Sequence, residues 1–238
     1  MARAALAPAV EASGFGGIGP GAYAFLDGLS ENNERGWFLA HKADYDTEIL
    51  APVRALVAAV SDRLQELAVP LVGDPLKAVF RPNRDVRFSR DKRPYKTETG
   101  AVLSRDGSKN SNGVLYIHIG SRGGFTACGF YQPDPADLQA LRTAIAARPK
   151  VFDGAMTGIE LSAEDTLTRM PRGFEQHAHE PFAPVLRLRN LVALRGLSRA
   201  DLAGPGAVEL IAAHAAACRK LLEFGWSATH GVVQQRRV

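Results

Sequence analysis

Apolar side chains in the first third of this chain recur at the spacing of an α-helix. They fall at steps of three and four through residues 23–29 and again through residues 45–67, which places them on one face of each predicted helix. Pro52 must kink the second run or divide it in two. Asn33 precedes a further short helical segment and is expected to cap it.

The middle of the chain has the composition and alternation of β-strands. We predict a short strand at residues 78–80 and longer strands at 97–104, 114–119 and 125–131, the last two joined as a hairpin by the glycine-rich residues 120–124. Side chains of a strand alternate between its two faces. The second long strand should therefore present Leu115, Ile117 and Ile119 on one face, and Tyr116 and His118 on the other.

Helical spacing returns in the last part of the chain. We predict helices at residues 135–147, 151–156 and 206–224, with a strand at 188–194. Helices, then strands, then helices indicate an α+β fold, a single domain with an antiparallel or mixed sheet on which helices pack. The expected organisation is a flexible N-terminal extension at residues 1–21, followed by the domain at 22–238.

Composition indicates an ordinary globular protein. Hydrophobic residues make up 46% of the 238 residues and charged residues 23%. No apolar stretch approaches the roughly 20 residues that span a bilayer, so no membrane association is expected. Cys128 and Cys218 are far apart and form no disulfide framework, which favours a reducing, cytoplasmic location. The sequence identifies no cofactor and does not define the oligomeric state.

Positive charge is concentrated in one segment. Residues 77–96 contain eight basic and two acidic residues, a local charge of +6, whereas the whole chain carries only +4. Residues 83–94 follow neither a helical nor a strand period and are predicted to form an ordered loop. Loops between sheet elements are common places for binding sites, and arginine binds carboxylates and phosphates through two points.

This segment suggests an enzyme, or a binder that evolved as one, for an anionic small molecule. The cations expected to hold a phosphate or carboxylate are Arg84, Arg87, Lys92 and Lys96, joined by Arg35 from the short helix. Asp85 or Asp91 would orient these cations or serve as a general base. Tyr95 or His118 would transfer protons. The competing interpretation is that the charges neutralise one another in a structural salt-bridge network.

Two other functions fit the same segment. Phe80, Phe88 and Tyr95 alternate with the cations, as in proteins that contact phosphates and stack on bases, so nucleic-acid binding is an alternative. The small total charge and the absence of a recognised binding motif count against it. A third possibility is a structural protein that works through an interaction surface.

The remaining candidates have weaker signals. The glycine-rich residues 14–21 could suggest a nucleotide loop, but no strand precedes them. His177, His179 and Glu180 could suggest a metal site, but no third ligand is evident, and no metal is predicted. His214 and Cys218 share a helix face that is expected to be packed in the core.

Residues 84–97 resemble the signature of an uncharacterised family, domain-of-unknown-function family 2461. Residues 32–38 with His41 and Lys42 resemble its N-terminal motif, and residues 129–133 and 171–174 resemble its later motifs. The resemblance runs from about residue 23 to about residue 197; the glycine-rich leader and the histidines after residue 174 depart from it. It implies no known reaction. It implies that residues 84–97 and 32–42 form one functional or architectural unit.

Overall fold

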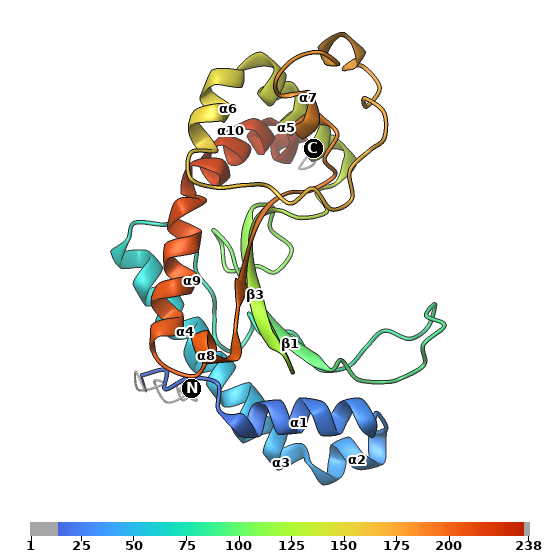
Figure 1. Cartoon of the computed structure of the whole chain (residues 1–238), viewed down its shortest axis with the longest axis vertical. Coiled ribbons are helices and arrows are strands. Elements are labelled where there is room, and N and C mark those ends of the chain that lie inside the picture. The colour runs from blue at the N-terminus through green and yellow to red at the C-terminus, as the bar shows by residue number, and fades with distance from the viewer. Residues whose placement is uncertain (1–13, 236–238) are drawn as a thin grey trace, which may run out of the picture.

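The computed structural model of the protein describes the backbone of residues 14–235 and the side chains of residues 14–229. Within this range four strands form an antiparallel sheet: β1 (Glu98–Leu103), β2 (Val114–Gly120), β3 (Gly123–Phe130) and β4 (Leu191–Leu197). Each strand pairs with the next along the chain (Figure 1). The predicted α+β fold is confirmed, and the sheet is antiparallel rather than mixed.

The sheet has one covered face and one open face. Leu115, Ile117 and Ile119 of β2 are fully buried, whereas Tyr116 and His118 are half-buried on the opposite side. This is the predicted alternation, and it follows from the two-residue period of a strand.

Helices pack over the covered face and beyond one end of the sheet. α4 (Ala51–Glu66) packs against β1 and α9 (Gly206–Ala217), while α9 and α10 (Arg219–Gln235) contact β3. α5 (Pro135–Ala147) and α6 (Pro149–Ala155) pack against α10. Further helices are α1 (Pro20–Glu31), α2 (Arg35–Ala40), α3 (Lys42–Asp44), η2 (Glu175–His177), α7 (Ala183–Leu186) and α8 (Arg199–Leu202). No helix in residues 14–235 is long and apolar enough to cross a membrane.

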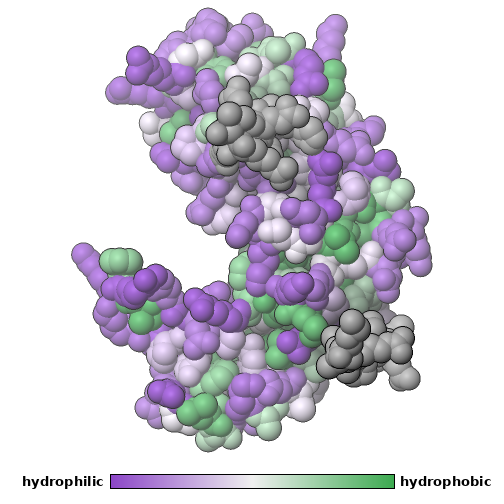
Figure 2. Space-filling view, turned by 180° about the vertical axis from the view of Figure 1, so that it is seen from behind, coloured by the Kyte–Doolittle hydropathy of each residue, from purple (hydrophilic) through white to green (hydrophobic). Residues whose placement is uncertain are grey.

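The open face of the sheet lines a hollow. α1, α2 and α3 lie beyond one end of the sheet, and α5, α6 and α7 lie beyond the other, so the molecule curves around this face (Figure 1). The space-filling view from behind shows the same hollow as a deep indentation (Figure 2). The loop that precedes β1 projects beside its opening.

A π-helical segment, η1 (Tyr45–Leu50), joins α3 to α4. The Ala51 N–H donates to the Asp46 carbonyl, five residues earlier, instead of the residue four back. Pro52 follows at once and has no N–H to donate. The predicted kink or division at Pro52 therefore takes the form of a wider helical turn, a feature that often marks functional sites.

Three predicted elements need correction. Residues 206–224 form two helices that meet at Cys218. The chain divides there because α9 packs against α4 and the sheet, whereas α10 packs mainly against α5 and α6. Residues 78–80 form no strand and make a single bridge, from Val79 to Ala101 of β1. The strand predicted at 188–194 begins at Leu191, because Leu188 instead bridges to Thr166 in the preceding loop.

The predicted extension at residues 1–21 is described only in part, since residues 1–13 lie outside the described residues. Phe15 and Ile18 are buried, with exposed fractions of 4% and 2%. The Ile18 N–H donates to the Leu202 carbonyl at 2.8 Å. Residues 14–19 therefore pack on the domain, and Pro20 begins α1.

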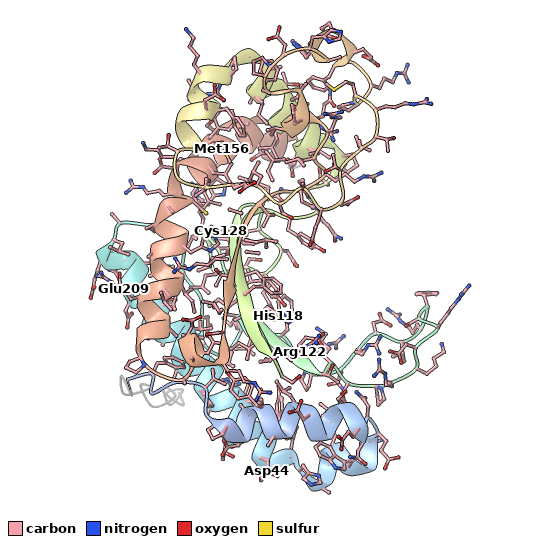
Figure 3. All side chains as sticks on the ribbon, in the orientation of Figure 1. Asp44, His118, Arg122, Cys128, Met156 and Glu209 are labelled. Atoms are coloured by element: carbon pink, nitrogen blue, oxygen red, sulfur yellow. The ribbon has the colours of Figure 1, made fainter. Side chains whose placement is uncertain are left out.

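A small polar group lies behind the sheet, between β3 and α9. Thr126 Oγ1 and His214 Nδ1 are 2.6 Å apart, and both side chains are buried. Cys128, labelled in Figure 3, and Cys218 are both free and buried, and their thiols are close enough to interact. This burial agrees with the interpretation of His214 and Cys218 as packed core residues.

Gly225 of α10 is expected to tolerate no side chain. A Cβ at this position would lie 2.2 Å from the Phe130 ring, which is only 1% exposed. Gly225→Ala should therefore lower the free energy of unfolding by about 1–3 kcal/mol, as overpacking does. Urea denaturation followed by circular dichroism measures this change.

Gly154 of α6 is the matched control, since a Cβ there meets no atom within 4 Å. Gly154→Ala should leave stability unchanged or raise it by up to about 1 kcal/mol, because alanine is the better helix former. Equal destabilisation by both substitutions would contradict the contact between α10 and β3.

Candidate functional site

The segment predicted as an ordered loop forms a hairpin-like excursion ahead of β1. Asn83 and Tyr95 face each other in a β-bridge. The Arg84 N–H donates to the Pro94 carbonyl, and the Lys96 N–H donates to the Pro82 carbonyl, each at 2.8 Å. We call the paired residues 82–84 and 94–96 the loop root, and residues 85–93 the loop tip.

The side chain of Asn33 holds the loop root in place. Its Nδ2 donates to the Tyr95 carbonyl and its Oδ1 accepts from the Tyr95 N–H, both at 3.0 Å. The Tyr95 ring is buried and stacks on Phe38, with centroids 4.1 Å apart. These contacts join the two segments that were expected to form one unit.

The prediction that Asn33 caps a helix is wrong. Glu34 occupies the N-cap position of α2, and its side chain makes no capping hydrogen bond. The Asn33 amide instead satisfies one backbone donor and one backbone acceptor of Tyr95. Both groups belong to a half-buried segment, so leaving them unpaired would be costly.

Ion pairs inside the loop neutralise much of its charge. Asp91 Oδ2 lies 2.6 Å from Arg84 Nη1 and 2.7 Å from Arg93 Nη2. In the loop tip, Arg87 Nη2 lies 2.7 Å from Asp85 Oδ2. All of these side chains are at least 28% exposed, so the pairs organise the loop more than they stabilise the fold.

The arginines also lower the pKa values of both carboxyl groups. Side-chain hydrogen bonds from Arg93 and then Arg84 hold the pKa of Asp91 well below its usual range. The side-chain hydrogen bond from Arg87 lowers the pKa of Asp85. A carboxylate with a depressed pKa is a weak base. Of the two roles that the sequence left open, the geometry favours orienting the arginines over general-base catalysis.

The loop tip is open to solvent. The Arg87 side chain is 76% exposed, and Phe88 is 96% exposed. The Arg87 guanidinium lies 5.8 Å from the centre of the Phe88 ring. Lys92 Nζ donates to the Val86 carbonyl at 3.0 Å, which closes the tip on itself.

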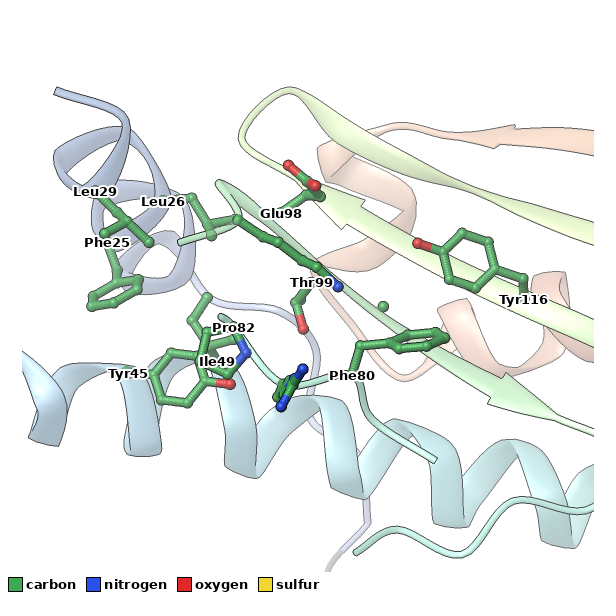
Figure 4. Close-up of a pocket in the computed structure, with 13 residues that line it drawn as sticks. Phe25, Leu26, Leu29, Tyr45, Ile49, Phe80, Pro82, Glu98, Thr99 and Tyr116 are labelled. Carbon is green, nitrogen blue, oxygen red and sulfur yellow. The ribbon is translucent and has the colours of Figure 1, made fainter. Parts of the chain in front are cut away.

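Two neighbouring pockets lie where the loop root meets β1. The outer pocket is lined by loop residues, among them Arg84, Asp91 and Arg93. The inner pocket lies between α1, η1, the loop root and strands β1 and β2 (Figure 4). Lys96 and Glu98 line both pockets and mark the boundary between them.

Two lysines approach the ring of Phe80, which lines the inner pocket. Lys96 lines this pocket as well, whereas Lys109 is not part of its lining. Lys96 Nζ lies 5.1 Å from the centre of the Phe80 ring, and Lys109 Nζ lies 5.0 Å from it. Lys109 also donates to the Val79 carbonyl at 3.2 Å. Neither lysine forms an ion pair with any residue that the structure describes. Both ammonium groups are therefore without a salt bridge among these residues, and Glu98 is the acidic residue that lines the same pocket.

Tyr116 and His118 extend the site along the open face of β2. The Tyr116 hydroxyl lies 3.2 Å from Nδ1 of His118, the residue labelled on β2 in Figure 3. His118 also stacks on Phe125, with ring centroids 4.6 Å apart. A Cβ on Gly100 would lie 2.7 Å from the Tyr116 hydroxyl, so the glycine makes room for this ring. Burial lowers the pKa of His118, and the charge of Glu98 opposes that shift.

The structure brings together only part of the predicted site. Arg84, Asp91, Tyr95 and Lys96 line the outer pocket, and Lys96 also reaches the inner one. His118 lies beside the inner pocket through its contact with Tyr116. Neither pocket includes the remaining predicted residues, which are Arg35, Asp85, Arg87 and Lys92.

The prediction missed several polar residues of the site, among them Glu98, Thr99 and Tyr116 in the inner pocket and Lys109 beside Phe80. Tyr116 could have been found, because it shares the strand face of His118. Lys109 lies in an irregular segment whose approach to Phe80 leaves no pattern in the sequence. The residues 14–229 contain no group of three or more histidine, cysteine or acidic side chains that could hold a metal ion. His177 packs between Phe174 and Phe182.

The chain belongs to the family of conserved hypothetical proteins called DUF2461, whose model matches residues 21–224. The match covers the sheet, the loop and both pockets. No curated protein matches the chain, and no solved structure does.

The Asn33 contact should control the order of the loop. Asn33→Ala removes both hydrogen bonds to the Tyr95 backbone and should lower the free energy of unfolding by about 1–3 kcal/mol. It should also speed tryptic cleavage within residues 84–93. Urea denaturation and limited proteolysis with mass spectrometry measure the two effects.

Asn32→Ala is the matched control, because Asn32 is exposed and bonds only within its own helix end, to Gly28. It should change stability by less than about 0.5 kcal/mol and leave the cleavage rate unchanged. Equal cleavage rates in both variants would show that Asn33 does not hold the loop.

His118 should make stability depend on pH. Its folded-state pKa lies below the unfolded value of about 6.5, so the unfolded state binds more protons between the two values. Wild type should therefore lose stability relative to His118→Gln as pH falls below 6.5, and the difference should be constant above that pH. Urea denaturation between pH 5 and 8 measures it. A relative gain in wild-type stability at low pH would contradict the burial of His118.

Proposed function

We propose that this protein binds a small anion, a phosphate or a carboxylate, at the loop root, and that it acts as an enzyme or as a binder descended from one. Lys96 and Lys109 hold the anion at the mouth of the inner pocket. Arg84 and Arg93 strengthen the positive field from the outer pocket. Arg35, Arg87 and Lys92 stay outside the site in this proposal.

The position of the two lysines carries this proposal. Both ammonium groups lie about 5 Å from the Phe80 ring and lack a carboxylate partner within the described residues. Arg84, Arg87 and Arg93 each have an acidic partner inside the loop. Arg90 and Lys92 have no such ion pair among the described residues either, but they line neither pocket. The acidic residues of the loop thus pair with arginines, and Lys96 remains available to a ligand.

Tyr116 and His118 supply the groups for proton transfer. Because burial lowers the pKa of His118, its imidazole is mostly neutral at pH 7 and can accept a proton. The nearby Tyr116 hydroxyl can hold or relay that proton. Both side chains project from the same face of β2, beside the positively charged mouth. In this proposal His118 is the base, and Asp85 and Asp91 orient arginines.

One observation favours the alternative of nucleic-acid binding. Phe88 is 96% exposed at the loop tip, next to the exposed cation of Arg87. An aromatic ring with an adjacent cation is how many proteins hold single-stranded nucleic acid. This surface is separate from both pockets, so the two functions predict different effects of substitution.

Binding measurements on the lysines test the proposal. Phosphate, nucleotides, sugar acids and simple carboxylates are screened by thermal shift, and hits are titrated calorimetrically. Lys96→Ala and Lys109→Ala should each weaken binding of a hit at least about tenfold, or about 1.4 kcal/mol. Lys92→Ala is the matched control, because this lysine belongs to the same loop but lines neither pocket. It should leave affinity within about twofold.

Each outcome bears on one function. No binding by any anion, or equal losses in all three lysine variants, would overturn the proposed site. Single-stranded DNA is titrated in parallel at several salt concentrations. Steeply salt-dependent DNA binding that requires Phe88 but not Lys96 would support the nucleic-acid alternative instead.

A further inference from the structure

The inner wall of the inner pocket is apolar. It is formed by Phe25, Leu26 and Leu29 of α1 and by Ile49 of η1, all of which are at most 6% exposed. Phe80 closes the opposite side (Figure 4). Burial against such a wall stabilises the binding of apolar ligand atoms. The wall offers no hydrogen bonds to replace the water around a strongly hydrated ion.

The π-helical segment gives this wall its shape. Tyr45 and Ile49 both line the pocket and lie on the inward side of η1. The bond from Ala51 to Asp46 skips one residue compared with an α-helix, which widens the turn that carries these side chains. Pro52 fixes the position of this wider turn, because it cannot supply the regular hydrogen bond.

One buried polar atom faces this apolar space. Thr99 is 7% exposed, and its Oγ1 has no hydrogen-bond partner among the described residues. The hydroxyl points toward the space bordered by Ile49, Phe80 and Pro82 (Figure 4). Buried hydroxyl groups nearly always have a hydrogen-bond partner. An unpaired hydroxyl in the wall of a pocket is therefore available to hydrogen-bond a ligand.

The mouth of the pocket selects among anions. Lys96 and Lys109 attract a negative charge, but the Glu98 carboxylate stands at the same mouth. The attraction of the cations grows in proportion to the charge of the ligand, but the cost of removing water from an ion grows with the square of its charge. A phosphate dianion therefore loses more than a monocarboxylate on entering this largely apolar pocket. The polar end of the ligand is therefore better matched by a monocarboxylate.

We infer that the ligand of the inner pocket is a small monocarboxylate with an aromatic or branched apolar group. Its carboxylate meets Lys96 and Lys109 at the mouth, its apolar group packs on the wall formed by α1 and η1, and an oxygen of the ligand accepts from Thr99. This inference rests on the proposed anion site and adds the chemical class of its ligand.

Titration calorimetry with benzoate, isovalerate, acetate and inorganic phosphate tests this assignment. Benzoate and isovalerate should bind at least about tenfold more tightly than acetate or phosphate, since only they carry an apolar group. Thr99→Val keeps the shape of the side chain and removes its hydroxyl. It should weaken benzoate about five- to tenfold, yet leave the melting temperature of the free protein unchanged or higher.

Two further variants locate the ligand. Thr97→Val is the matched control for Thr99→Val, because Thr97 lines the outer pocket, and it should change benzoate affinity less than about twofold. Ile49→Trp fills the inner pocket and should remove the advantage of benzoate over acetate. Should Ile49→Trp fail to fold, the comparison of Thr99→Val with Thr97→Val decides the question alone.

Failure of this inference can be told from failure of the anion site. If acetate and phosphate bind as tightly as benzoate, and Lys96→Ala weakens all of them, the anion site stands and the apolar ligand class is wrong. Equal effects of Thr99→Val and Thr97→Val would also overturn the inference. If no anion binds at all, both proposals fall together.

Discussion

The two hydrogen bonds between Asn33 and the backbone of Tyr95 are the contact on which the site depends. They fix the loop root against the first three helices, and the stacking of Tyr95 on Phe38 extends the same contact into the core. The loop root then enters β1, so the position of Lys96 relative to the sheet is set as well. Without this contact, the helices that form one wall of the inner pocket and the loop that forms its mouth would be joined only through the core.

The pairing of charges decides which part of the basic loop is available for binding. Asp91 is shared by two arginines of the loop, and Asp85 occupies Arg87. The competing structural interpretation expects such internal salt bridges. They neutralise cations in the loop tip and in one arm of the loop root. They leave Lys96 free of ion pairs within the described residues, next to Lys109 from another segment. The structural network and the proposed site therefore coexist, with the network holding the shape that presents Lys96.

Local patterns predicted what is locally determined. The alternation in β2 correctly placed Leu115, Ile117 and Ile119 in the core and His118 on the open face, and the family resemblance correctly linked residues 32–42 to the loop. The π-helical turn, the orphan hydroxyl of Thr99 and the approach of Lys109 to Phe80 could not be predicted. Each depends on how segments far apart in the sequence pack in space, and no periodicity or composition records that packing. For the same reason the Asn33 cap was wrong, since its true partner lies 62 residues away.

In the proposed complex a carboxylate binds across Lys96 and Thr99, with its apolar group against α1 and the π-helical segment. Crystals grown with 4-bromobenzoate test it most directly, because the anomalous signal of bromine locates the apolar end of the ligand without interpretation of weak density. We expect one dominant bromine peak in the inner pocket, among Leu26, Ile49 and Phe80, with the carboxylate toward Lys96. A dominant peak at the loop tip beside Phe88, or an empty inner pocket at saturating ligand, would contradict it.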